Sequence, residues 1–148
     1  MDLKNLYDAF SKYPLKPTIE GCPCCDLANS ELGLHKRKLK ELEWNDLSLF
    51  IFKAMTTFGD VDDFKHFLPR IFELYCTSFY GAPYDVGVLF SKLEYANFRS
   101  WPKDERDVTI ESLRAWLSDL KVSSADASED VYNEICSDLK RYGFGGLV

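Results

Sequence analysis

The sequence has few of the features that mark enzymes and membrane proteins. Its 148 residues include only two His, and we find no glycine-rich phosphate loop, no Gly-x-Ser-x-Gly elbow and no His-Glu-x-x-His pair. The longest stretch without a charged residue is too short, and too often interrupted by polar groups, to cross a bilayer. The sequence therefore gives no support to the common phosphate-loop, serine-hydrolase and zinc-protease classes, and it predicts a protein that does not span a membrane.

Glycine and proline are also scarce, with 8 and 6 residues, whereas 46% of the residues are hydrophobic. This composition is typical of one compact domain and argues against a disordered chain. A chain of this length buries about 70% of the surface that it exposes when unfolded, so it needs no disulfide framework in order to fold. The start MDLKNLYDAF carries two acids and no small-residue cleavage site, and we therefore expect a cytoplasmic protein.

Hydrophobic residues recur at helical spacing, and no segment alternates as a strand does. Asp60 and Ser128 stand where helix N-caps are expected, and Gly59 and Gly143 where helices end. Pro69 falls inside one helical pattern and predicts a kink or a break. We predict an all-α fold, a single compact domain of six or seven helices over residues 1–148. The predicted helices cover residues 2–13, 44–58, 60–75, 85–97, 102–121 and 128–142, and residues 14–42 form an irregular, cysteine-containing segment with at most a short turn near 30–33.

Three cysteines lie within four residues of the irregular segment, at Cys22, Cys24 and Cys25. Thiolates are preferred ligands of zinc, and a turn that contains proline can bring such closely spaced sulfurs together. A second Cys-x-x-Cys pair is absent, so a closed site needs a further ligand from elsewhere in the chain. Two other interpretations stay open. The thiols can be small buried apolar groups, or two of them can form a disulfide, which a reducing cytosol disfavours.

His66 is the best candidate for the further ligand. Its helix carries one narrow polar stripe at about 100° per residue. The stripe consists of Asp62, His66, Arg70 and Glu73. An Asp four residues before a His can orient the ring, as carboxylates do behind metal-bound histidines. We predict a structural zinc site of Cys22, Cys24, Cys25 and His66. The competing interpretation is a solvated helix face with Asp62–His66 and Arg70–Glu73 pairs, each worth about 0.2 to 0.5 kcal/mol.

The negative charge is concentrated in the C-terminal third. The chain has 18 Lys and Arg against 24 Asp and Glu, a net charge of −6, and residues 102–138 hold 10 of the acids with 4 of the bases. A field of this sign repels phosphate backbones and attracts basic proteins, so nucleic-acid binding is disfavoured. The basic cluster within 36–40 is interpreted as a solvated segment. The predicted binding residues are Asp62, Arg70, Glu73, Asp104, Glu105 and Glu111.

Three segments together resemble a family of uncharacterised bacterial proteins. They are Gly-Cys-Pro-Cys-Cys at 21–25, Thr-x-Gly-Asp-x-x-Asp-x-Lys-His-Phe-Leu-Pro-Arg within 56–74, and a Trp-Pro helix entry within 93–105. Phe58 departs from the family, in which Trp is expected. The resemblance implies a bacterial origin, a shared helical fold and joint action of the three clustered cysteines with His66. It implies no particular reaction.

Two hypotheses about function follow. The first is a small cytoplasmic binding protein, for example an immunity protein or antitoxin, that blocks a basic toxin through its acidic C-terminal helices. Its small size, localised charge and abundant aromatic residues favour this class. The second is a metal- or thiol-dependent enzyme that uses the locus of Cys22–Cys25 and His66, with one metal position open to water. We favour the first hypothesis because the sequence contains no evident catalytic set.

Overall fold

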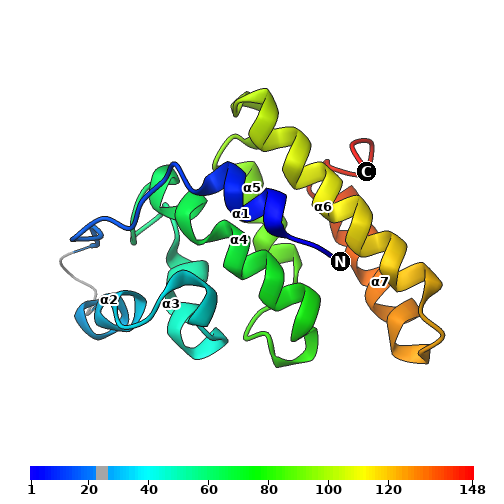
Figure 1. Cartoon of the computed structure of the whole chain (residues 1–148), viewed down its shortest axis with the longest axis horizontal. Helices are drawn as coiled ribbons and strands as arrows, with labels where there is room; N and C mark the ends of the chain where they lie inside the picture. The colour runs from blue at the N-terminus through cyan, green and yellow to red at the C-terminus, as the bar shows by residue number, and fades with distance from the viewer. Residues whose placement is uncertain (23–26) are drawn as a thin grey trace. The chain divides into compact units, whose positions relative to one another are not determined.

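The structure is a computed structural model that describes residues 1–22 and 27–148. Within these residues the chain forms seven α-helices and no β-strand, which confirms the predicted all-α class (Figure 1). The α-helices are α1 (Lys4–Phe10), α2 (Ala28–His35), α3 (Trp44–Lys53), α4 (Val61–Thr77), α5 (Gly87–Tyr95), α6 (Lys103–Val122) and α7 (Asp126–Arg141). The short 3-10 helices are η1 (Leu39–Glu41), η2 (Phe79–Gly81) and η3 (Phe98–Ser100).

Backbone contacts divide the chain into two compact units. The 10–84 unit consists of residues 10–84 and contains α2, α3 and α4. The C-terminal unit consists of residues 1–9 and 85–148 and contains α5, α6 and α7. The prediction of one domain over residues 1–148 stays a prediction.

A cluster of aromatic rings forms the core of the 10–84 unit. Phe50 of α3 is fully buried and lies 4.7 Å from the ring of Phe67 and 5.5 Å from the ring of Phe58, measured between ring centroids. Helix α3 ends at Lys53, so the prediction of a helix to residue 58 is wrong. The chain turns instead: Phe58 N–H donates to the Lys53 carbonyl at 3.1 Å, and Met55 takes a left-handed conformation with φ of 64°. This turn places the Phe58 ring against Phe50.

Helix α4 begins with the predicted cap. Asp63 N–H donates to the Asp60 carboxylate at 3.0 Å, and Asp60 N–H donates to the Asp63 carboxylate at 2.9 Å, which is a reciprocal capping arrangement. Of the kink or break predicted at Pro69, the break does not occur: the helix is continuous from residue 61 to residue 77. Pro69, Ile71 and Phe72 are all buried. Packing of the residues beyond the proline outweighs the loss of one backbone hydrogen bond.

The segment predicted to be irregular, residues 14–42, contains α2 and η1. Helix α2 extends well beyond the predicted turn near 30–33. Only Leu34 of α2 is buried, so the helix lacks the apolar stripe by which periodicity identifies a helix. Its stability comes from contact with α3 and from polar bonds to the preceding segment.

In the C-terminal unit, α7 contacts both α5 and α6. Helix α7 begins at residue 126, two residues before the predicted cap Ser128, whose hydroxyl donates instead to that of Ser123 at 2.9 Å. Its end is as predicted. Gly143 has φ of 79°, and Phe144 N–H donates to the Leu139 carbonyl at 2.7 Å, which is a Schellman arrangement. None of the helices in the described ranges combines the length and the apolar sequence that crossing a membrane requires.

Candidate functional site

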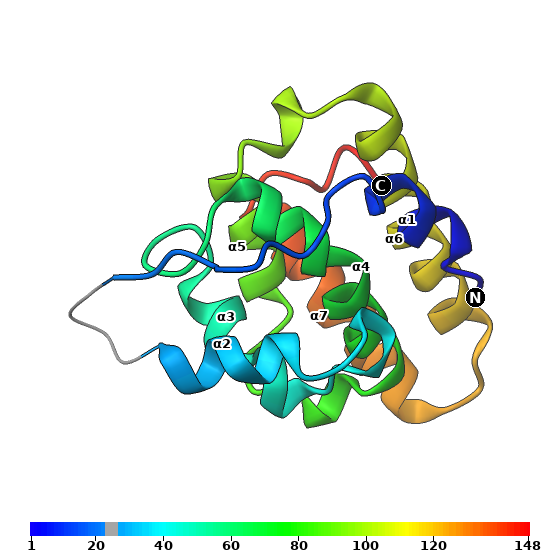
Figure 2. The same cartoon turned by 60° about the vertical axis from the view of Figure 1, so that its left-hand side comes forward.

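Residues 13–22 form a non-helical segment that runs antiparallel to the start of α4 (Figure 2). Its last part pairs with the turn before the helix: Cys22 N–H donates to the Thr57 carbonyl at 2.8 Å, and Gly59 N–H donates to the Glu20 carbonyl at 2.6 Å. Its middle is held by the Lys16 ammonium, which lies 2.7 Å from the Asp60 carboxylate. Residues 20–22 and 57–59, which are distant in the sequence, therefore lie side by side.

The predicted zinc ligands are not all within the described part of the chain. Cys22 is disulfide-bonded in the structure. Cys24 and Cys25 lie outside the described residues. Because a sulfur held in a disulfide is not a thiolate, the disulfide and a zinc–Cys22 bond are alternative states of this residue. The two cysteines elsewhere in the chain, Cys76 and Cys136, are not disulfide-bonded.

His66 lies at the opposite end of the 13–22 segment from Cys22. Its Nδ1 is 2.7 Å from the carbonyl oxygen of Tyr13, so Nδ1 is the donor and Nε2 carries the lone pair when the ring is neutral. Burial lowers the pKa of His66, against the opposing effects of the Tyr13 bond and the Asp63 charge. This chemistry suits a metal ligand, but the described residues contain no group of three or more ligating side chains. The zinc site stays a prediction.

His35 is held by two acceptors. Its Nδ1 is 2.8 Å from the Glu31 carbonyl oxygen, and its Nε2 is 2.8 Å from the Lys16 carbonyl oxygen. A carbonyl oxygen only accepts, so both bonds form only when the ring is protonated on both nitrogens. The bonds to Glu31 and Lys16 raise the pKa of His35. The resulting positive charge also lowers the pKa of His66, so the two histidines favour opposite protonation states.

We expect the two histidines to give stability profiles of opposite slope. Because the folded-state pKa of His35 is raised, its contribution is full below the ordinary pKa of about 6.5 and is lost as the pH rises through the folded value. The contribution of neutral His66, whose pKa is lowered, is present above about 6.5 and is lost as the pH falls. Urea unfolding from about pH 5 to about pH 8 tests this. The advantage of the unsubstituted protein over His35→Gln should shrink with rising pH, and its advantage over His66→Gln should grow; parallel profiles would contradict the assignment.

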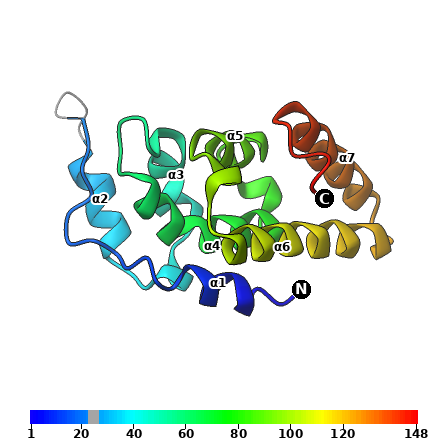
Figure 3. The same cartoon turned by 90° about the horizontal axis from the view of Figure 1, so that it is seen from above.

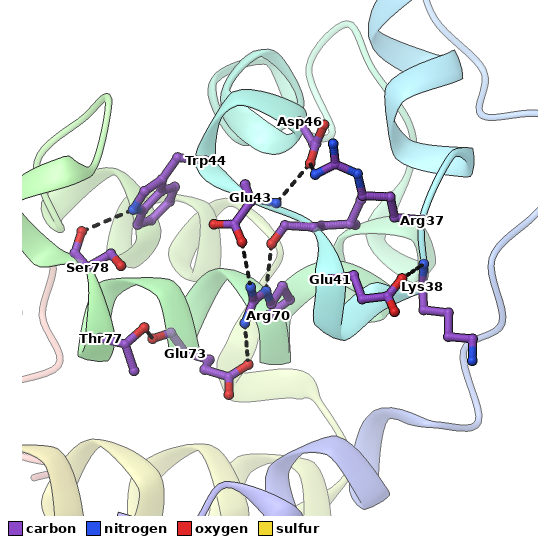
Figure 4. Close-up of polar contacts among 11 residues, drawn as sticks. Arg37, Lys38, Glu41, Glu43, Trp44, Asp46, Arg70, Glu73, Thr77 and Ser78 are labelled. Carbon is purple, nitrogen blue, oxygen red and sulfur yellow. Dashed lines mark hydrogen bonds and ion pairs between the residues drawn. The ribbon is translucent and has the colours of Figure 1, made fainter.

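Arg70 of α4 is a structural residue rather than part of a solvated face. Its side chain is 12% exposed, and its Nε donates to the Leu42 carbonyl at 2.7 Å (Figure 4). The predicted pair with Glu73 is confirmed at 2.8 Å, and the Glu43 carboxylate lies 3.7 Å away. Arg70 thereby joins the start of α3 to α4. The predicted partner of His66, Asp62, is exposed, and His66 bonds to the Tyr13 carbonyl instead.

The predicted acidic residues of α6 differ in exposure. Asp104 and Glu111 are exposed, and Glu111 lines a pocket of about 360 Å³ together with Asp107 and Arg114. Glu105 is fully buried, with an exposed fraction of 0%. A carboxylate with no exposed surface cannot contact a partner, so the prediction that Glu105 is a binding residue is wrong.

Four further acids form a line along α7 that we name the acidic stripe. It consists of Asp126, Asp130, Glu134 and Asp138. Residues four apart share one side of a helix, whereas the buried residues Val131, Ile135 and Leu139 lie on another. Like charges at this spacing destabilise a helix by about 0.2 to 0.5 kcal/mol per pair. Within the described residues none of the four carboxylates forms an ion pair, in contrast to the Lys103–Asp107 pair of α6.

A fifth carboxylate adds to the repulsion. Partial burial and the charges of Asp85 and Asp138 raise the pKa of Glu134. Partial burial and Asp85 also raise the pKa of Asp138, although Arg141 and a bond from Gly87 N–H oppose this effect. Asp85 precedes α5, so it reaches α7 only through the packing of α5 on α7. The fold thus brings a carboxylate that precedes α5 close to two carboxylates of α7.

The negative charge lies in the predicted third of the chain, but the stripe was not among the predicted binding residues. The four-residue spacing of its members could have been found from the sequence, since it is a local pattern on a predicted helix. The contribution of Asp85 could not, because it depends on contact between helices far apart in the sequence.

Searches of the chain against protein-family models, curated proteins and solved structures find no match. The assignment of function therefore rests on the residues and their geometry.

Proposed function

We propose that this chain is a cytoplasmic binding protein that recognises a basic protein partner through the acidic stripe of α7 and Asp85. The unpaired arrangement of the stripe carries the proposal. Four carboxylates at i, i+4 spacing repel one another. Partial burial, together with the charge of Asp85, also raises the pKa values of Glu134 and Asp138. A cationic partner would remove that repulsion on binding, so the charge that weakens the free protein would strengthen the complex.

The dimensions of the stripe define the kind of partner. From Asp126 to Asp138 the helix rises by about 18 Å at 1.5 Å per residue. A basic helix or extended segment with Lys or Arg at matching intervals can pair with it along this length. The abundance of aromatic residues supports the proposal less than the charge does. Rings such as those of Phe50, Phe58 and Phe67 are fully buried in the core of the 10–84 unit, so they cannot contact a partner.

Blocking of a basic toxin, as an immunity protein or antitoxin does, is the form of this function that we propose. Such a partner is commonly the product of an adjacent gene, so the test is direct. The neighbouring product is expressed in a bacterial host with and without this chain. We expect growth inhibition by the neighbour alone and recovery when the chain is present. A neighbour that is harmless, or whose toxicity persists with the chain present, counts against the proposal.

Charge variants test whether the stripe makes the contact. In the double variant D130N/E134Q the side-chain shapes are retained and two charges are removed. We expect partner affinity, measured by calorimetry at low salt, to fall at least about tenfold, and growth recovery to weaken. The melting temperature should not fall. The raised pKa of Glu134 means that its charge lowers stability as the pH rises through the folded value, so its neutralisation relieves this effect at neutral pH.

The matched control is E20Q/E94Q. Glu20 and Glu94 are exposed acids outside the stripe, and their replacement changes the net charge by the same amount. The control should bind the partner as the unsubstituted protein does. Equal weakening in both double variants would show that only net charge matters, and would refute a localised contact surface.

A further inference from the structure

The C-terminal unit contains a pocket of about 430 Å³ between α6, α7 and the C-terminal residues. This volume falls within the range of about 300 to 1,000 Å³ that is common for small-molecule sites. Leu117 of α6, Leu139 of α7 and the C-terminal residues Gly145 and Val148 contribute to its walls. Figure 3 shows the C-terminal residues turning back beside α7.

Three cationic side chains line this pocket of an otherwise acidic protein. They are Arg114 and Lys121 of α6 and Lys140 of α7. Arg114 donates to the Leu147 carbonyl at 2.8 Å, and the Lys121 ammonium lies 5.1 Å from the centre of the Tyr132 ring. Within the part of the chain that the structure describes, none of the three forms an ion pair with a carboxylate. The net charge of −6 makes this convergence of unneutralised cations unusual.

The antiparallel arrangement of α6 and α7 places different residues at the two ends of the pocket. Helices α6 and α7 are joined by three residues, so they run in opposite directions and the early part of α7 lies beside the late part of α6. Lys121 and Tyr132 therefore mark one end, and Arg114 and Lys140 mark the other. Leu117 and Cys136 lie between them. Seven residues of α6 separate Arg114 from Lys121, which is about 10 Å along the helix.

We propose that this pocket binds an amphiphilic organic anion with a single alkyl chain. The anionic head lies between Arg114 and Lys140, where the guanidinium that is bonded to the Leu147 carbonyl and one ammonium can share it. The alkyl chain lies along Leu117 and Cys136 toward the ring of Tyr132. A carboxylate and a phosphate monoester share this chemistry of a negative head on an apolar chain. The site is separate from the acidic stripe, and it stands or falls independently of the proposed protein partner.

Calorimetric titration of the full chain tests the proposal, with decanoate as the probe because its alkyl chain suits the length of about 10 Å between the ends. We expect binding at one molecule per chain. Decanol lacks the charge and should bind at least about tenfold more weakly, and inorganic phosphate, which lacks the chain, should compete poorly. Comparison of the affinities of decyl phosphate and decanoate shows whether the pocket prefers a phosphate monoester or a carboxylate head group. Equal binding of decanol and decanoate, or no binding of decanoate at millimolar concentration, would overturn the proposal.

Variants and a chemical probe localise the binding. We expect R114Q/K140Q to weaken decanoate binding at least about tenfold. The control K36Q/K38Q removes two exposed cations of the 10–84 unit and should leave binding unchanged. If R114Q/K140Q fails to fold, alkylation of the unsubstituted protein shows whether decanoate binds in this pocket. Bound decanoate should slow alkylation of the Cys136 thiol, which lines the pocket, and should leave the rate of alkylation of Cys76 unchanged. Unchanged alkylation of Cys136 would show that decanoate binds elsewhere.

Discussion

Replacing Phe50 by alanine is expected to lower the free energy of unfolding by about 3 to 5 kcal/mol. Phe50 has no exposed surface, and its ring contacts those of Phe58 and Phe67, which arrive from the turn after α3 and from α4. Removal of the ring leaves a cavity that three separate backbone segments would have to move to fill. Urea unfolding followed by circular dichroism measures the loss.

Phe52 provides the matched control for this substitution. It lies two residues further along α3, but 56% of it is exposed, and it stacks on Tyr84 at 5.2 Å. Phe52→Ala should lower the free energy of unfolding by less than about 1.5 kcal/mol, the loss of one aromatic pair. Equal losses for Phe50→Ala and Phe52→Ala would show that the ring cluster is not the core of the 10–84 unit.

Replacing Arg70 by alanine is expected to have the second largest effect, a loss of about 2 to 3 kcal/mol of stability. The guanidinium is the donor to the Leu42 carbonyl and to the Glu73 carboxylate. Its removal takes a donor away from the carbonyl oxygen of a buried residue and from a half-buried carboxylate. Hydrogen bonds that involve charged groups contribute about 1.5 to 3 kcal/mol, and an acceptor stranded in the interior adds a desolvation penalty. Thermal unfolding of the variant measures the effect.

Two further variants separate the geometry of Arg70 from its charge. Arg70→Lys keeps the charge but lacks the planar fork that reaches both acceptors, so we expect it to recover less than half of the loss. Arg37→Ala removes a guanidinium that is 44% exposed and lies 3.4 Å from Asp46, and it should change stability by less than about 1 kcal/mol. A full recovery by lysine would mean that Arg70 acts only as a point charge.

The features that the sequence predicted correctly are governed by local chemistry. The Asp60 cap, the Gly143 stop and the entry of α6 after Pro102 each depend on a few adjacent residues. The end of α3 and the presence of α2 were missed because distant contacts decide them. Phe58 turns back onto the core rather than extending α3, and α2 is anchored through His35 to the 13–22 segment.

The candidate sites also contain some features that the sequence predicts and others that it does not. The Arg70–Glu73 pair was predictable because its members are three residues apart on one helix. The bond from Arg70 to the Leu42 carbonyl was not, and this bond makes the residue structural. The burial of Glu105 and the presence of Arg114 and Lys140 in one pocket likewise depend on how helices pack, which side-chain periodicity does not specify.

The acidic stripe also bears on how the protein would respond to laboratory evolution. Exchange of any one of its carboxylates for a neutral amide lessens the repulsion within α7. A screen that selects only for thermal stability should therefore enrich such neutral substitutions. A screen that selects for both thermal stability and partner binding should reject the same substitutions. Comparison of the survivors of the two screens would therefore reveal which charges the protein retains for recognition at the expense of its own robustness.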